Sequence, residues 1–189
     1  KAFLDSATQA SFEHKGVRIQ TYRWGNGPRN ILLVHGWQSH TYRWKRYIES
    51  ISKEEYSIYA FDAPGHGMSG GKFLSVPLYS EIIENFISRT GKMESIVSHS
   101  IGSFSALYTF YRNPTLASNN LVTLASPGEA QEFFDFYARS LSLSEKSISL
   151  ISNRFEDLFQ RSPRYFSAPR FASSLNVPGL IIHDEDDDD

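Results

Sequence analysis

The feature that most constrains the fold is a series of short, continuous apolar runs along the chain. The runs cover residues 30–36, 56–62, 94–100, 120–126 and 177–184. Unbroken apolar runs of this length are typical of strands buried on both faces of a parallel sheet. Helical patterns separate them, so the sequence predicts an α/β fold with a doubly wound, mostly parallel sheet and right-handed crossovers.

The helical patterns connect one predicted strand to the next. Apolar residues recur at helical spacing over 44–51 and over 78–87. A third helix is predicted over 101–112, because Asn113 and Pro114 end the pattern. These are the positions that crossover helices of a parallel sheet occupy.

Two segments depart from this alternation. Residues 12–24 alternate apolar and polar side chains around a turn, which predicts an N-terminal antiparallel hairpin. Residues 129–170 carry two helical patterns and no strand, so we expect a small helical cap insertion within a single domain that covers 1–189. Its aromatic side chains could line an apolar acyl pocket, but their helical spacing favours a place in the core. They are Phe133, Phe134, Phe136, Tyr137, Phe155 and Phe159.

Composition excludes several classes of protein. The chain has no cysteine, which rules out disulfides, a thiolate nucleophile and cysteine metal sites, and is typical of a cytoplasmic protein. No apolar run approaches the ~20 residues of a membrane span, and no signal segment opens the chain. Outside the six acids at 184–189, 19 basic residues stand against 15 acidic ones. The basic residues are scattered, so we expect no nucleic-acid partner. The oligomeric state is left open.

Ser100 is the first candidate for chemistry, because it lies where a buried strand meets a helix. A serine at the apex of such a turn is typical of a nucleophile elbow, usually Gly-x-Ser-x-Gly. The tight turn needs small residues two positions before and two after the serine, and Ser98 and Gly102 are both small. The alternative is that Ser100 only caps the helix that follows.

An elbow serine also needs backbone N–H donors for the oxyanion of its intermediate. One is expected from Ile101, the residue after the serine, and the other from Trp37 in the loop after the first buried strand. Gly36 would let that loop approach the substrate closely. The adjacent His35 is expected to be a structural hydrogen-bonding residue rather than a base.

Two further histidines lie at the same sheet edge. His66 sits between glycines in the loop after the second buried strand, where we expect it to have a structural role. His99 adjoins Ser100, but consecutive strand side chains point to opposite faces, so His99 should point away from the hydroxyl. We therefore predict that both support the site without acting as its base.

The last buried strand runs directly into the acidic stretch 184–189. A carboxylate at this edge could orient a catalytic histidine. The alternatives are a solvated acidic tail and a site for a hard cation such as Ca²⁺ or Mg²⁺. No glycine-punctuated ligand loop accompanies the run, so we expect neither a metal nor a cofactor.

In order along the chain, these motifs resemble those of the α/β-hydrolase superfamily, with the look of its small bacterial esterase-like members. They are "LLVHGW", "FDAPGHGMSGG", "VSHSIGS" and "VPGLIIHDEDD". The resemblance implies that Ser100 is the nucleophile and that the N–H groups of Trp37 and Ile101 form the oxyanion hole. It places the triad acid at Asp187, or at Asp188 if the register shifts by one residue.

The resemblance also implies a catalytic histidine after the acid, and here the sequence departs from the family pattern. The histidines all precede Asp187 and are His14, His35, His40, His66, His99 and His183. His183 lies too close to the acid along the same strand end to be a good substitute. We therefore expect a truncated chain, with the catalytic histidine, the last strand and the last helix beyond residue 189. The alternative is a natural member of the family that has lost its base.

The resemblance implies a serine hydrolase that cleaves a small-molecule carboxylic ester or thioester through an acyl-enzyme on Ser100. Two alternatives use the same fold. One is a non-catalytic protein that binds a ligand or partner, since a fold alone does not imply chemistry. The other is an acyltransferase, in which a different nucleophile reaches the acyl-enzyme.

Overall fold

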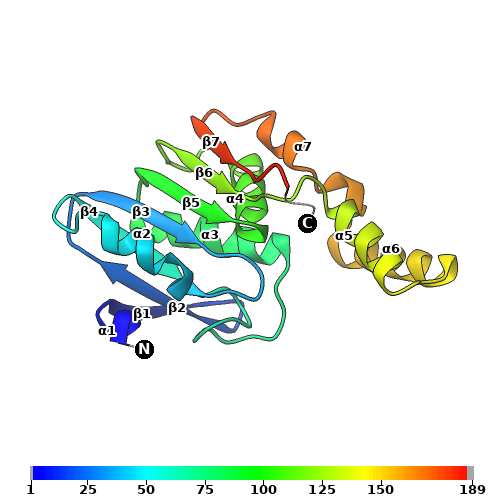
Figure 1. Ribbon diagram of the computed structural model, residues 1–189, viewed down its shortest axis with the longest axis horizontal. Helices are drawn as coiled ribbons and strands as arrows, with labels where there is room; N and C mark the ends of the chain where they lie inside the picture. The colour runs from blue at the N-terminus through cyan, green and yellow to red at the C-terminus, as the bar shows by residue number, and fades with distance from the viewer. Residues whose placement is uncertain (1, 187–189) are drawn as a thin grey trace.

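The computed structural model describes residues 2–186, and its strands form one sheet (Figure 1). The strand order is β1-β2-β4-β3-β5-β6-β7. Neighbours from β4 to β7 pair in parallel, whereas β1 with β2 and β2 with β4 pair antiparallel. The predicted parallel sheet with an N-terminal hairpin is therefore confirmed. The strands are β1 Thr8–His14, β2 Val17–Trp24, β3 Arg29–Val34, β4 Tyr56–Phe61, β5 Ser95–His99, β6 Leu121–Leu124 and β7 Gly179–Ile182.

Each predicted helix is present. They are η1 Thr41–Trp44 with α2 Lys45–Ser50, α3 Val76–Thr90, α4 Ile101–Arg112, α5 Ala130–Ser140 and α6 Glu145–Phe159. Three short helices, which carry too few residues to show a periodic pattern, were not predicted. They are α1 Ala2–Asp5, η2 Pro163–Tyr165 and α7 Ala168–Ala172.

Helices cover both faces of the sheet, and the central strand β3 shows why. Leu32 and Val34 join one buried cluster, which includes side chains of α3 and α4. Ile31 and Leu33 join a second cluster, which includes Trp44 of η1 and Ile48 of α2. Alternate residues of one continuous apolar strand thus face two different helical layers, as expected for a strand buried on both sides.

The prediction of a buried strand is wrong for β7. Leu180, Ile181 and Ile182 are 55%, 75% and 49% exposed. Within residues 2–186, β7 pairs only with β6, which makes it an edge strand. The sequence of an apolar edge strand looks the same as that of a central strand, because burial is decided by the neighbouring elements that cover the strand.

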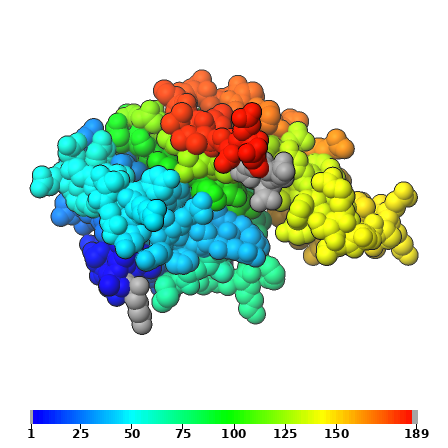
Figure 2. Space-filling model, in the orientation of Figure 1, coloured from blue at the N-terminus to red at the C-terminus, as the bar shows by residue number. Residues whose placement is uncertain are grey.

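The prediction that the aromatic residues of 129–170 lie in the core is wrong for most of them. Helices α5 and α6 contain no buried residue, and they project past the sheet (Figures 1 and 2). Phe133, Phe136 and Tyr137 are exposed, and Phe134, Phe155 and Phe159 are half-buried. Phe155 and Phe159 of α6 are the exceptions, since they pack against the main buried cluster and their rings contact the Phe166 ring edge-on. That this segment is a cap within one domain stays a prediction.

None of the helices described is both long enough and apolar enough to cross a membrane. Residues 2–186 also contain no cluster of three or more histidine, aspartate or glutamate side chains arranged to hold a metal ion.

Candidate active site

Ser100 lies at a strained turn between β5 and α4. Its φ of 52° and ψ of −128° are values that residues other than glycine rarely adopt. Two backbone hydrogen bonds hold the turn. The Ser100 N–H donates to the Leu124 carbonyl of β6 at 2.9 Å, and the Ser100 carbonyl accepts from the Phe104 N–H at 3.1 Å. The surrounding strand and helix thus impose a conformation that the residue itself disfavours.

The Ser100 hydroxyl does not act as a helix cap. Ser100 occupies the N-cap position of α4, but its side chain accepts no hydrogen bond from the first turn. The residue lines a cavity of about 720 Å³, within the range of ligand sites. The other lining residues are Ser126, Pro127, Gly128, Glu132, Phe133, Asp135, Phe136, Tyr137, Arg139 and His183.

The elbow is closely packed on the end of β3. A Cβ added to Gly102 would lie 2.4 Å from the His35 carbonyl oxygen, and one added to Gly36 would lie 3.0 Å from the Ser100 Cβ. Ser98 is fully buried, and its hydroxyl donates to the Val122 carbonyl at 2.9 Å. A serine therefore fits where the usual motif has its first glycine, whereas Gly36 and Gly102 leave no room for a side chain.

Replacing Gly102 with alanine should lower the free energy of unfolding by about 1–3 kcal/mol, since the new methyl group would overlap fixed backbone. The steric overlap should therefore cost more than the roughly 1 kcal/mol by which alanine is favoured over glycine inside a helix. Urea unfolding measures it. Gly70→Ala is the matched control, because its Cβ would meet nothing closer than 3.5 Å. Equal stability of the two variants would contradict the packing described.

His35 and His66 are held by backbone groups through both ring nitrogens. The His35 Nδ1 lies 2.8 Å from the Gly36 carbonyl, and its Nε2 accepts from the Ala63 N–H at 2.9 Å. Burial lowers the pKa of His35 to about 4, so the ring is neutral and carries its proton on Nδ1. The His66 Nδ1 lies 2.9 Å from the Pro64 carbonyl, and its Nε2 accepts from the Gln38 N–H at 3.2 Å. Both histidines connect the loops beside the elbow.

The two expected oxyanion donors belong to two segments that meet at the elbow, since a Cβ added to Gly36 would lie 3.0 Å from the Ser100 Cβ. Ile101 is the first residue of α4, where the backbone N–H groups have no partner within the helix. Trp37 follows Gly36, and its ring meets the His66 ring edge-on at 5.5 Å. The His66 bond to Gln38 fixes the loop one residue further on. The oxyanion role of both amides stays a prediction.

The structure places two of the remaining histidines, His99 and His183, near the elbow. His99 ends β5 and lies beside Gly36, since a Cβ on that glycine would be 2.8 Å from His99 Nδ1. His183 is exposed and lines the cavity that Ser100 lines, which sequence reasoning did not anticipate. Asp187 and Asp188, the two candidates for the triad acid, lie outside the described residues.

Sequence reasoning missed Asp62, a buried carboxyl group directly after β4. Its Oδ1 accepts from the Thr41 N–H at 2.9 Å. Its Oδ2 accepts from the Tyr22 hydroxyl at 3.0 Å and from the Met68 N–H at 2.9 Å. Burial, with the Asp62 carboxyl group nearby, raises the pKa of Tyr22 above its usual range, so the phenol stays a donor. The sequence signal that could have identified Asp62 is a single acidic residue between an apolar run and a glycine-rich loop.

A family model described as serine aminopeptidase, S33, matches residues 27–159. A monoacylglycerol lipase of Mycolicibacterium smegmatis is 34% identical over 79 residues, which are 40% of this chain and 28% of the lipase. The dihydrolipoyllysine-residue acetyltransferase component of the acetoin cleaving system of Cupriavidus necator is 28% identical over 90 residues, which are 46% of this chain and 24% of that protein. The chain thus spans about a quarter of the length of these relatives.

Among solved structures, the thioesterase domain from the curacin biosynthetic pathway has a TM-score of 0.65 at 17% identity. The likeness covers 93% of this chain and 81% of that domain. At this identity the likeness concerns the fold, including the sheet that carries the elbow.

Proposed function

Because this chain belongs to the serine aminopeptidase S33 family of α/β-hydrolases, we propose that the protein is a serine hydrolase of carboxylic esters or thioesters. The observation that carries the proposal is Ser100 itself. It sits at a strained strand-to-helix turn, lines a large cavity and leaves its hydroxyl unused as a helix cap. Backbone strain of this kind is concentrated at functional sites, so it favours a functional rather than a purely structural role for Ser100.

In the proposed first step, the Ser100 hydroxyl oxygen attacks the acyl carbon of the substrate. The hydroxyl proton passes to a histidine base, while the carbonyl electron pair moves to oxygen. The N–H groups of Trp37 and Ile101 stabilise this oxyanion. When the oxyanion collapses, the bond to the alcohol or thiol breaks, and the leaving group takes the proton from the histidine.

In the second step, water attacks the acyl-Ser100 ester. The same histidine accepts a proton from the water and returns it to Ser100 as the free acid leaves. We assign Asp187 the role of orienting that histidine and stabilising its charged form. His35 and His66 then support the oxyanion loop, which agrees with their hydrogen bonds to backbone groups beside Gly36 and Trp37.

We place the histidine base outside residues 2–186. His35 and His66 use both ring nitrogens on backbone groups. Among the described histidines, only His183 lines the cavity with Ser100. His183 is therefore the alternative base within the described part of the chain, and it can be tested directly.

Replacing His183 with alanine should slow hydrolysis of p-nitrophenyl butyrate less than tenfold, because the variant keeps the nucleophile, the oxyanion donors and the proposed base. The assay uses protein expressed from the complete gene. A loss as large as that of a Ser100 variant would identify His183 as the base, since members of a triad act as a unit. Absence of turnover in the unmodified protein would favour the non-catalytic alternative.

A further inference from the structure

A second, apolar cavity lies next to the Ser100 cavity. It has a volume of about 220 Å³ and is bounded by residues 74–77 at the start of α3, the start of α4, α5, α6 and Phe166. Its walls are aliphatic and aromatic, and they include Ile101, the residue after the proposed nucleophile. Phe133 lines both this cavity and the Ser100 cavity, so its side chain stands between the two.

The chemistry of the walls restricts what can occupy this cavity. Ser75 carries the one side-chain hydroxyl among the lining residues, and that oxygen accepts a hydrogen bond from the Leu78 N–H at 3.3 Å. A polar group placed here would lose its hydrogen bonds to water and find few replacements. A hydrocarbon chain would lose nothing and would gain from burial.

The size of the cavity restricts the length of that chain. A cavity of about 150 Å³ in another protein binds benzene, which has six carbon atoms, so by proportion a cavity of about 220 Å³ has room for roughly eight or nine carbon atoms. An acetyl group would leave it almost empty, and a chain of about sixteen carbons would exceed it. The volume fits an acyl chain of about eight carbons.

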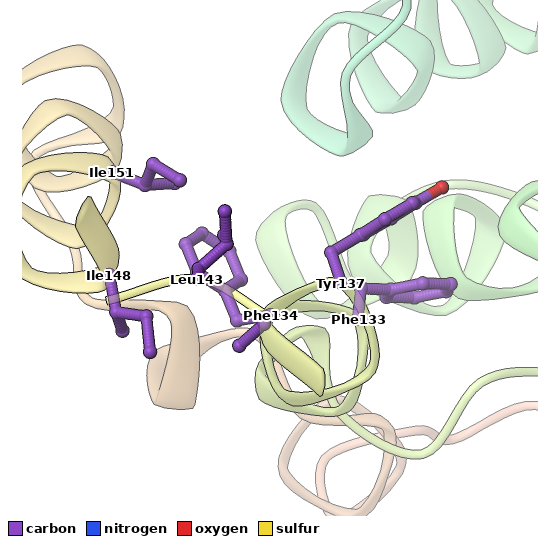
Figure 3. Close-up of a pocket in the computed structure, with 7 residues that line it drawn as sticks. Phe133, Phe134, Tyr137, Leu143, Ile148 and Ile151 are labelled. Carbon is purple, nitrogen blue, oxygen red and sulfur yellow. The ribbon is translucent and has the colours of Figure 1, made fainter. Parts of the chain in front are cut away.

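A third cavity adjoins the second along α5. It has a volume of about 210 Å³ and lies between α5 and α6, and Phe133 and Phe134 line it as well (Figure 3). Phe134 extends toward Leu143 and Ile148, whereas Phe133 and Tyr137 extend away from them (Figure 3). The Phe134 ring also meets the Phe155 ring edge-on at 5.3 Å. These two phenylalanines therefore divide one apolar space into compartments.

We propose that the apolar cavity beside Ile101 binds the acyl chain of a medium-chain aliphatic ester, and that Phe133 sets the preferred chain length. The proposal rests on the proposed function, because it assigns the substrate of the same Ser100 site. The Ser100 cavity, which carries Glu132, Asp135 and Arg139, is left for the more polar leaving group.

Binding of fatty acids tests the cavity without any catalysis. Calorimetric titration of the protein with sodium octanoate and sodium butyrate should give at least tenfold tighter binding of octanoate, since each added methylene is transferred from water to an apolar site. Ala130→Leu, which places a larger side chain in the cavity wall, should weaken octanoate binding at least tenfold. Leu158→Ala is the control, because Leu158 is exposed on α6 and lines none of the three cavities. Equal binding of both acids would overturn the proposal.

Hydrolysis of p-nitrophenyl esters of four, eight, twelve and sixteen carbons tests Phe133. The unmodified protein should favour the eight-carbon ester, and Phe133→Ala should shift the optimum toward twelve carbons by joining adjacent compartments. An unchanged profile in a folded Phe133 variant would overturn its assignment.

The two proposals fail in different ways. Octanoate binding without any ester turnover would retain the cavity and overturn the hydrolase. Turnover without a chain-length preference would retain the hydrolase and overturn the acyl cavity. The comparison of octanoate with butyrate needs only the unmodified protein, so it decides the question even if a variant fails to fold.

Discussion

Replacing Ser100 with alanine should reduce ester hydrolysis by about three to six orders of magnitude. The alanine variant keeps the oxyanion donors and the cavity but has no oxygen to attack the acyl carbon. The size of the loss follows from the way a nucleophile and its base act together, so that removing either one removes most of the rate. Initial rates with p-nitrophenyl butyrate, on protein from the complete gene, measure it.

Ser11→Ala is the control for this experiment. Ser11 is exposed on β1, the edge strand at the opposite side of the sheet from β7. Its replacement should leave the rate within a factor of two. A Ser100→Ala variant with native circular dichroism and more than a tenth of the original rate would show that another group performs the chemistry.

Replacing Asp62 with alanine should have the largest effect on stability, lowering the free energy of unfolding by about 3–5 kcal/mol, because several neutral donors lose their acceptor. The change removes an acceptor that serves the Thr41 N–H, the Tyr22 hydroxyl and the Met68 N–H. A buried donor left without a partner costs about 1–3 kcal/mol, and both the Thr41 N–H and the Tyr22 hydroxyl make buried bonds to Asp62. Together these contacts connect the hairpin, the loop after β3 and the loop after β4, so the loss should also loosen the oxyanion loop.

Urea unfolding followed by tryptophan fluorescence measures this effect. Asp157→Ala is the control, since Asp157 is exposed on α6 and its replacement should change stability by less than about 0.5 kcal/mol. Asp62→Asn should fall between the two, because it keeps the shape of the side chain but turns one acceptor atom into a donor. A loss below about 1 kcal/mol for Asp62→Ala would contradict the central role given to this carboxyl group.

The sheet and its crossover helices could be predicted from the sequence because their signals are local. Strands β3, β4, β5 and β6 are apolar runs, and α3 and α4 show helical periodicity with clear start and stop residues. The elbow also has a local signal in the sequence, because small residues, Ser98 and Gly102, stand two positions before and two after Ser100. The close packing of Gly102 on the end of β3 explains why a small residue is needed there.

Features that depend on distant partners could not be predicted. The exposure of Ile181 depends on which elements cover β7, and the exposure of Phe136 depends on where α5 leaves the sheet. The sequence does not show that the Asp62 carboxylate accepts three hydrogen bonds, because only the fold brings Tyr22, Thr41 and Met68 next to it. Each of these depends on contacts between segments far apart along the chain.

The central claim, that Ser100 is an activated nucleophile, is tested most directly by covalent labelling. Protein expressed from the complete gene is treated with a fluorophosphonate probe, digested and sequenced by mass spectrometry, beside a serine hydrolase of known reactivity. The account predicts one label per chain, on the Ser100 hydroxyl in the peptide that joins β5 to α4. An unlabelled Ser100, in a sample where the reference hydrolase is fully labelled, would contradict it.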